Sequence, residues 1–368
     1  MSKLYYSIVS LLFVFLIATP VKGATLDETL PIRGLCVQAP QRQQIDDFIK
    51  FIDEVLAPGK INTLILRVDY GFEYTSHPEL RGRNPYTKDD VKKLVEACKK
   101  HRINLIPHLQ LLGHQSWAKN TGRLLTVYPQ FDETPHVKTE NYTGWPNPDG
   151  LYCKSYCPLH PDVHKIMYAL VDELMDAFEA TDFHAGMDEV FYIADDKCPR
   201  CAGKDPAELF AGEVSKVRDH LAQKNRKLWI WGDRLLDGRE TGIGEWEAAT
   251  NGTAPAINMI PKDVFICDWH YERAELTSVL FVAKGLRVAS CPWKKPEVAA
   301  AQIADMVRFR RQANRRMVPR FQGVIQTVWG SAESFIRAYN NLPPEEANGE
   351  SEAACFKRVL AEIVKLAE

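Results

Sequence analysis

The stretch Asp182-Phe183-His184-Ala185-Gly186-Met187-Asp188 has the length of one buried strand and ends in a carboxylate. Seven further short runs rich in apolar and β-branched residues recur along the chain: 33–38, 62–69, 103–109, 227–233, 264–269, 286–290 and 323–329. Longer stretches with apolar residues at three- and four-residue spacing lie between them, such as 41–56, 88–101, 161–179 and 207–224. Eight strands that alternate with helices predict an α/β fold, a (β/α)₈ TIM barrel.

The composition is that of a packed globular protein. Of the 368 residues, 45% are hydrophobic and 26% charged, which excludes a disordered chain. The 46 basic and 48 acidic residues form no long run of one sign, so we expect no nucleic-acid partner. No linker rich in proline, glycine or serine divides the chain. We therefore expect a single catalytic domain over residues 31–343, with residues 344–368 forming a C-terminal helix that packs on the barrel.

The first 23 residues are typical of a secretory signal peptide. Lys3 precedes an apolar run from Ile8 to Ala18, which is too short to span a bilayer, and the small residues Gly23 and Ala24 follow. Cleavage after Gly23 predicts a secreted or periplasmic protein with no membrane segment in its mature form. An uncleaved membrane anchor is the alternative.

Catalytic groups of such a barrel come from the carboxyl ends of its strands. Polar residues stand at five of the predicted ends: Asp69, Gln110 to His114, Asp188-Glu189, Asp233, and Asp268 to Tyr271. One such aspartate alone more often caps a helix. Four tryptophans, Trp231, Trp269, Trp293 and Trp329, fall at the same ends, although each could instead be a buried barrel residue. Flat apolar rings beside carboxylates favour a saccharide site.

The segment from His184 to Glu189 resembles the H-x-G-G-D-E signature of glycoside hydrolase family 20, the β-N-acetylhexosaminidases, with Met187 in place of the second glycine. Other segments are similar to that family in the same strand order, from about Pro31 to about Ala338. They are Arg33-Gly34, Asn62-Thr63-Leu64, Leu112-Gly113-His114, Trp231-Gly232-Asp233 and Thr327-Val328-Trp329-Gly330. The resemblance implies a bare catalytic barrel.

Two adjacent carboxylates cannot easily flank one scissile bond, which fits a substrate-assisted mechanism better than two opposed protein carboxylates. The resemblance implies that Glu189 is the general acid/base. It implies that Asp188 orients the substrate's 2-acetamido oxygen as an internal nucleophile and stabilises the oxazolinium intermediate. The alternative is a surface Asp-Glu pair.

The resemblance also implies substrate contacts around this pair. Arg33 would bind sugar hydroxyls, and Asp69 and His114 would form a pair that sets the pKa of the acid. Asp268 would hold the acetamido arm, with Tyr271 in a related role. The remaining candidates for the substrate-binding site are Trp231, Asp233, Trp269, Trp293 and Trp329.

Three positions depart from the family pattern. Ile266 replaces a tyrosine, Ser331 replaces an acidic residue with Glu333 two positions further on, and Gln110 replaces an acidic residue on the third strand. These changes alter the sugar contacts. The sequence therefore leaves open the glycan, the preference for gluco or galacto sugars, and the oligomeric state.

Four of the nine cysteines predict a structural feature. Cys153 and Cys157 follow the third strand, and Cys198 and Cys201 follow the fourth, so barrel order brings the two pairs to neighbouring loops. They could bind a structural zinc ion or form two disulfides. We expect no cofactor for catalysis.

The sequence thus predicts an exported glycosidase that removes terminal β-linked N-acetylhexosamine from glycans with retention of configuration. A carbohydrate-binding barrel without catalysis is one alternative. A metal-dependent hydrolase is another, but it would need histidines and carboxylates on several strand ends, where only His114 stands.

Overall fold

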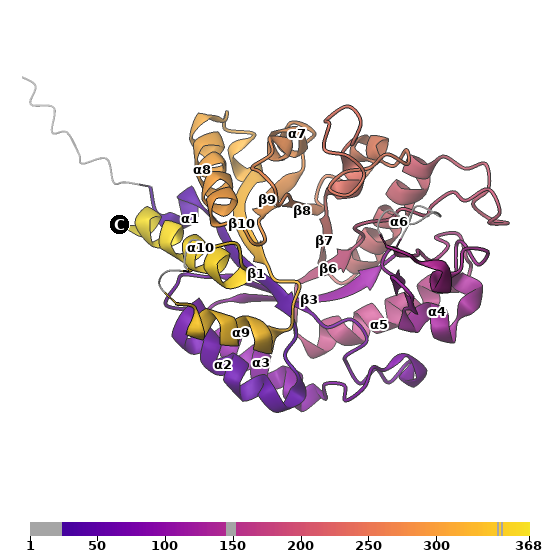
Figure 1. Ribbon diagram of the computed structural model, residues 1–368, viewed down its shortest axis with the longest axis horizontal. Coiled ribbons are helices and arrows are strands. Elements are labelled where there is room, and N and C mark those ends of the chain that lie inside the picture. Colours follow the sequence, from indigo (N-terminus) through magenta and orange to yellow (C-terminus); the bar gives the residue numbers. More distant parts are fainter. Residues whose placement is uncertain (1–23, 145–151, 344–345, 347–348) are drawn as a thin grey trace, which may run out of the picture.

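The computed structural model describes residues 24–144, 152–343, 346 and 349–368, so the predicted signal peptide lies outside the described residues. Within this part of the chain, eight parallel strands close into a barrel in the order β1-β10-β9-β8-β7-β6-β3-β2. Their bounds are β1 Ile32–Gln38, β2 Thr63–Arg67, β3 Asn104–Leu111, β6 Asp182–Gly186, β7 Lys227–Trp231, β8 Phe265–Trp269, β9 Arg287–Cys291 and β10 Phe321–Thr327. The predicted (β/α)₈ barrel is confirmed (Figure 1).

Four strands end about two residues before their predicted limits. At the end of β2, the amides of Val68 and Asp69 both donate to the carbonyl oxygen of His108, and Asp69 has a φ of +48°. The backbone thus turns out of the sheet while it is still hydrogen-bonded to β3. The same early departure after β6, β7 and β10 moves Asp188, Asp233 and Trp329 from the strands into the loops that follow.

Helices cover the outside of the barrel (Figure 1). The longer ones are α2 Ile45–Phe51, which continues as a π-helical turn over Ile52–Leu56, α3 Lys88–Lys100, α5 Val163–Ala177, α6 Pro206–Ala222, α7 Thr277–Ala283, α8 Pro296–Gln312, α9 Ala332–Asn341 and α10 Glu352–Ala367. Short helices lie at α1 Leu26–Thr29 and α4 Arg123–Val127. None of the described helices is long and apolar enough to cross a membrane.

Successive side chains of each barrel strand point alternately into the barrel and towards the helices, so the protein has two apolar cores. Side chains that point into the barrel, such as Ile65, Ile106 and Cys267, pack together with Trp229 and Trp231. Side chains of opposite parity, including Ile266, pack against the surrounding helices. Because successive side chains of a strand point to opposite faces, one residue of shift decides whether a side chain can reach the pocket at the end of the barrel.

The loop after β3 is the longest insertion at the carboxyl end of the barrel. It contains the small hairpin of β4 Ser116–Trp117 and β5 Asn120–Thr121 and then α4, and it returns through residues 152–157. Buried Lys154 anchors this return, because its ammonium group donates to the carbonyl oxygens of Thr134 and Val137 at 2.7 and 2.8 Å and pairs with Asp132. Lys154 thus ties the return segment to residues 132–137 of the same insertion.

The C-terminal helix α10 packs against α8 and α9 on one side of the barrel (Figure 1). Glu352 in its first turn accepts hydrogen bonds from the indole nitrogen of Trp293 at 2.7 Å and from the backbone amide of Trp329 at 2.9 Å. The last helix therefore positions two aromatic side chains at the carboxyl ends of β9 and β10.

Barrel closure between β1 and β10 depends on Gly323. Its φ is +148°, and a Cβ atom there would lie 1.9 Å from the carbonyl oxygen of Ile32.

Gly323→Ala should lower the free energy of unfolding by about 3 kcal/mol, measured by denaturant titration. Gly212→Ala is the matched control, because Gly212 lies in α6 with open space around it. It should stabilise the protein by up to about 1 kcal/mol. Equal effects would contradict this account of closure.

Candidate active site

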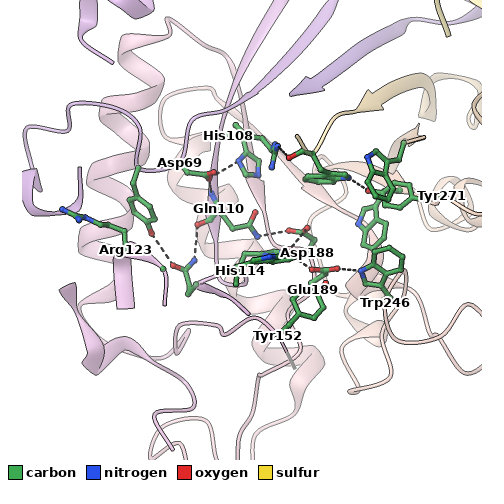
Figure 2. Close-up of a pocket in the computed structure, with 18 residues that line it drawn as sticks. Asp69, His108, Gln110, His114, Arg123, Tyr152, Asp188, Glu189, Trp246 and Tyr271 are labelled. Carbon is green, nitrogen blue, oxygen red and sulfur yellow. Dashed lines mark hydrogen bonds and ion pairs between the residues drawn. The ribbon is translucent and has the colours of Figure 1, made fainter. Parts of the chain in front are cut away.

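A cavity of about 680 Å³ opens at the carboxyl ends of the strands. Its walls combine charged and polar side chains with tyrosine and tryptophan rings (Figure 2). The lining residues are Arg67, Asp69, Tyr70, His108, Gln110, His114, Gln115, Trp117, Gly122, Arg123, Tyr152, Asp188, Glu189, Trp246, Trp269, Tyr271, Trp293 and Trp329. Such a mixture suits a small molecule with apolar faces that pack on the rings and polar groups that form hydrogen bonds.

The turn after β6 places two carboxylates in this cavity. Gly186, Met187 and Glu189 all have left-handed backbone conformations, with φ of +67°, +65° and +49°. A Cβ atom on Gly186 would lie 2.0 Å from Oε1 of Gln110, so only glycine leaves room for that amide. Met187 adopts a conformation that favours glycine, and its fully buried side chain packs in the outer core, which offsets the strain.

Asp188 is held in its ionised form. Its oxygens accept a hydrogen bond from Nε2 of Gln110 at 2.8 Å and lie 3.3 Å from Nε2 of His114. Burial raises the pKa of this carboxyl, but the opposing charge and hydrogen bond of His114 and the Gln110 amide outweigh burial and lower the pKa below its usual range. The carboxylate therefore keeps a negative charge inside a largely apolar cavity.

Glu189 has different partners. One oxygen lies 2.9 Å from Nε2 of His114, and the other accepts a hydrogen bond from the indole nitrogen of Trp246 (Figure 2). The hydroxyl of Tyr152 also contacts this carboxylate, and burial and the negative charge of Glu189 together raise the pKa of Tyr152. The side chain of Glu189 is thus fixed from three directions.

His114 connects the two acids. Burial lowers its pKa, but the charge of Asp188 and the hydrogen bonds to both carboxylates raise it well above the usual value. The imidazole ring also stacks on Trp117, with centroids 5.7 Å apart. A protonated His114 therefore lies between Asp188 and Glu189 and balances their charge.

Asp233 supports the turn from below. Its Oδ2 accepts the backbone amide of Glu189 at 2.8 Å and a hydrogen bond from Nε of Arg234 at 2.7 Å. Burial raises the pKa of Asp233, Arg234 lowers it, and the charges of Asp188 and Glu189 raise it further, with a net rise. The expectation that Asp233 contacts substrate is wrong, since this carboxylate is fully buried behind the turn and positions Glu189.

Four aromatic residues predicted from the sequence lie in the pocket wall: Trp269, Tyr271, Trp293 and Trp329. The indole nitrogen of Trp329 donates to the hydroxyl of Tyr271 at 2.8 Å, and Tyr271 packs between Trp269 and Trp293 with centroids 5.0 and 5.2 Å away. These rings, tilted relative to one another, form an aromatic wall of the pocket that holds the two carboxylates.

Trp231 was expected in the same wall but lies behind it. Its side chain is completely buried, packed between His184 and Trp329. It points into the barrel one layer below the cavity, so it supports Trp329 and does not face a ligand.

Arg33 was expected to bind sugar hydroxyls, and this is wrong. It stands at the beginning of β1, at the opposite end of the barrel from the pocket. Its guanidinium donates to the carbonyl oxygens of Leu30 and Lys60 at 2.6 and 2.8 Å and pairs with Asp27. Arg33 therefore holds the N-terminal segment against the barrel.

The predicted pair of Asp69 and His114 is also wrong. Asp69 lies 3.3 Å from Nδ1 of His108 and accepts the backbone amide of Gln110 at 2.9 Å, whereas His114 pairs with Asp188 and Glu189. Both residues line the pocket, but their partners differ because His108 lies on β3 beside the end of β2.

Asp268 does not reach the pocket. Its side chain points outward from β8, where it accepts a hydrogen bond from the hydroxyl of Thr277 at 2.7 Å and pairs with His270. The prediction that Asp268 holds the acetamido arm is therefore wrong, because alternate residues of β8 point to opposite faces and Asp268 lies on the outer one. Ile266 lies on the same outer face. Trp269, one residue later, points inward and lines the cavity.

The other two departures have local explanations. Ser331 caps α9 by accepting the amide of Ser334, and Glu333 accepts the amide of Gln41 at 2.6 Å outside the pocket. Gln110 donates a hydrogen bond to Asp188 through its uncharged amide. The negative charge of Asp188 is therefore balanced by His114 and not by residue 110.

Sequence reasoning missed several residues of the pocket wall, among them Arg67, Trp117, Tyr152 and Trp246. Trp246 lies on a loop, Trp117 lies in the small hairpin of the insertion, and Tyr152 lies on its return. Arg67 ends β2, where it donates to the carbonyl oxygen of Trp329 at 3.0 Å. Arg67 could have been found, because it precedes Asp69 by two positions and so shares its strand face. The loop residues carry no periodic signal that places them in the pocket.

The four cysteines predicted to act together are separated. Cys157, Cys198 and Cys201 cluster with Glu133, whereas Cys153 donates to the carbonyl oxygen of Glu189 at 3.3 Å. The four-cysteine set and the two-disulfide pairing are therefore wrong. The sulfur of Cys153 also lies near His114 and Glu189, but Nε2 of His114 already pairs with the carboxylates of Asp188 and Glu189.

The pocket has the features of an enzyme that cleaves glycosidic bonds: a fixed pair of carboxylates beside an aromatic wall at the carboxyl end of a (β/α)₈ barrel. Comparison with known proteins agrees. Residues 39–295 match the model of glycosyl hydrolase family 20, catalytic domain. The chain belongs to this family.

Two curated relatives illustrate the degree of similarity. A beta-hexosaminidase of Akkermansia muciniphila is 28% identical over 229 residues, which are 55% of this chain and 44% of that protein. A lacto-N-biosidase of Bifidobacterium bifidum is 23% identical over 224 residues, 58% of this chain and 18% of that protein. The chain thus matches less than half the length of either relative.

Solved structures resemble the fold over most of the chain. A beta-N-acetylhexosaminidase structure has a TM-score of 0.63 at 20% identity and covers 91% of this chain and 71% of its own. The chitobiase of Flavobacterium johnsoniae has a TM-score of 0.60 at 19% identity and covers 91% and 51%. These likenesses support the barrel architecture.

The central position of His114 predicts a pH-dependent contribution to stability. Because its pKa is raised on folding, this contribution is complete below the unfolded value of about 6.5 and declines as pH rises towards the folded value. The deficit of His114→Gln in the free energy of unfolding should therefore be at least about 1 kcal/mol larger at about pH 5.5 than at about pH 9. Denaturant titrations at both pH values test this.

The control uses Asp188→Asn, which removes the main charge that holds His114 protonated. In that background, adding His114→Gln should produce a smaller change with pH. Parallel stability curves for wild type and His114→Gln would contradict the ionic bridge.

Proposed function

We propose that this protein is a β-N-acetylhexosaminidase that removes terminal β-linked N-acetylhexosamine from glycans. The observation that carries the proposal is the arrangement of Asp188 and Glu189, adjacent in sequence and fixed by different partners at the aromatic pocket. Family membership supports the same reaction class.

Substrate assistance explains why two neighbouring carboxylates suffice. Asp188, held ionised by His114 and Gln110, accepts the N–H of the substrate's 2-acetamido group and aligns its oxygen for attack on the anomeric carbon. As the C–O bond to the leaving group breaks, a cyclic oxazolinium ion forms. The negative charge of Asp188 stabilises this cation in a site of low polarity.

In its protonated form, Glu189 supplies the proton for the leaving oxygen. The carboxylate that results, which His114 stabilises, then removes a proton from the water that opens the oxazolinium ring. Two inversions at the anomeric carbon give net retention. The Trp246 and Tyr152 donors and the Asp233 contact fix the orientation of Glu189. Trp269, Trp293 and Trp329 supply flat surfaces for the C–H face of the sugar.

We also infer that the protein is exported, to the periplasm or the cell exterior. The basic residue, short apolar run and small residues of positions 1–23 support export. An extracellular location would place the enzyme beside glycan substrates. No cofactor takes part in the proposed mechanism.

The first test compares aryl glycosides that differ only in the 2-substituent. The aryl β-N-acetylglucosaminide should be hydrolysed at least about 10²-fold faster than the β-glucoside, because only the former carries the internal nucleophile. The matching β-N-acetylgalactosaminide reports the sugar preference. Equal rates on glucoside and acetamido sugar would refute substrate assistance. Binding of N-acetylglucosamine without any turnover would favour a carbohydrate-binding barrel.

The second test separates the roles of the two acids. Glu189→Gln should lose far more activity on a natural linkage than on an aryl glycoside with an acidic phenol, which needs little proton donation. Asp188→Asn should lose about 10²-fold or more on both, because ring closure slows whatever the leaving group is.

The matched control is Glu333→Gln, the same chemical change at a carboxylate outside the pocket, which should keep wild-type rates. If leaving-group dependence appeared in Asp188→Asn instead, the two roles would be reversed. If neither variant lost activity, the proposed function would fail.

A further inference from the structure

A second cluster of reactive groups lies apart from the cavity. The sulfur atoms of Cys157, Cys198 and Cys201 and a carboxylate oxygen of Glu133 all lie within 4.8 Å of one another, and all four residues are buried. Glu133 and Cys157 belong to the insertion after β3, whereas Cys198 and Cys201 belong to the loop after β6. The cluster therefore joins two loops that are distant in sequence.

The spacing of the sulfurs suits a common metal ligand. Cys157 Sγ lies 3.4 Å from Cys201 Sγ and 3.6 Å from Cys198 Sγ. A tetrahedral zinc site with Zn–S bonds of about 2.3 Å places its sulfurs roughly 3.8 Å apart. The three thiols thus surround one point at nearly the required distances.

Glu133 supplies independent evidence for a cation. Its side chain is fully buried, and Oε1 accepts the backbone amide of Asp195 at 3.1 Å. Oε2 is also buried and has no hydrogen-bond donor in good geometry among the described residues. The neighbours of the carboxylate include the thiols of Cys198 and Cys201, which are weak donors. A buried carboxylate oxygen without a partner is costly unless a positive charge lies beside it.

Backbone amides point towards two of the three sulfurs. Cys198 and Cys201 form a C-x₂-C motif, and the backbone amides of Arg200 and Cys201 donate towards the sulfur of Cys198. The amide of Leu159 donates towards Cys157 in the same way. N–H donors of this kind suit a thiolate that is bound to a metal ion.

We propose that Glu133, Cys157, Cys198 and Cys201 bind a structural Zn²⁺ ion with three sulfur ligands and one oxygen ligand. Four protein ligands leave no open position, so this ion stabilises the fold and does not act on substrate. A disulfide could use only two of the three sulfurs. It would leave the third thiol and the Glu133 oxygen without partners.

The ion would connect the two loops that carry the site's acid and histidine. From Cys157 the chain runs back through Lys154, whose carbonyl oxygen accepts the amide of Gln115 at 2.9 Å, next to His114. It then reaches Cys153, whose thiol contacts the carbonyl oxygen of Glu189. Zinc would therefore limit the movement of His114 relative to Glu189. The inference does not depend on which glycan is cleaved.

The test measures metal content in the full-length chain purified without chelator or reductant. Elemental analysis should find about one zinc per chain. Cys157→Ser, Cys198→Ser and Cys201→Ser should each lose most of it, and Glu133→Gln should release zinc at lower chelator concentrations than wild type. Cys98→Ser and Cys355→Ser are matched controls, since each removes a buried thiol elsewhere, and both should retain zinc.

A measurement on the wild type avoids variants that fail to fold. Exchange of the bound metal for Co²⁺ should produce sulfur-to-cobalt charge-transfer absorption and the strong visible bands of a tetrahedral ion. Chelator should lower the melting temperature, and added Zn²⁺ should restore it.

Three outcomes would overturn the proposal. One is a chain free of zinc whose thiols stay reduced and which shows no cobalt spectrum. Another is a disulfide between any two of the three cysteines, detected by mass spectrometry of unreduced peptides. The third is zinc that persists when Cys157 and Cys201 are both replaced in a folded protein.

Discussion

The site depends on one imidazole, partly exposed to the pocket, that lies between two carboxylates. Asp188 and Glu189 are adjacent residues in a cavity of low polarity, where two negative charges without a cation would be costly. His114 lies 3.3 and 2.9 Å from them and compensates for this repulsion. Because His114 lies on the loop after β3 and the acids lie on the loop after β6, the ionic bridge also fixes the two loops relative to each other.

Much of the remaining structure supports this bridge. Asp233 and Arg234 hold the backbone of Glu189 from below, Gln110 reaches Asp188 over a glycine, and Trp246 orients the second oxygen of Glu189. Met187 and Glu189 adopt left-handed backbone conformations, which are strained for residues with a side chain. The surrounding contacts stabilise this geometry. The aromatic wall depends in turn on Glu352 of α10, so even the last helix contributes to the pocket.

The two polar clusters have different tasks. The carboxylate pair faces a cavity and keeps its groups accessible to a ligand, whereas the cluster of Glu133 and three cysteines is closed on all sides. The same two loops contribute to both. A rigid connection between the two loops at the buried cluster would keep Glu189 and His114 at a fixed distance in the pocket.

The sequence by itself determined the barrel, since the alternation of short apolar runs and amphipathic stretches can be satisfied by few folds. It also identified Asp188 and Glu189, because the turn after β6 and its signature are local. Only the tertiary structure decided which partners surround them. The prediction for Arg33 was wrong because this residue lies at the start of β1, at the end of the barrel opposite the pocket. The prediction for Asp268 was wrong because its side chain points outward from β8. Hydrophobic periodicity could not predict the positions of Trp246 and Tyr152, or the grouping of Glu133 with Cys157. These residues lie on long loops, whose positions depend on contacts between residues far apart in the chain.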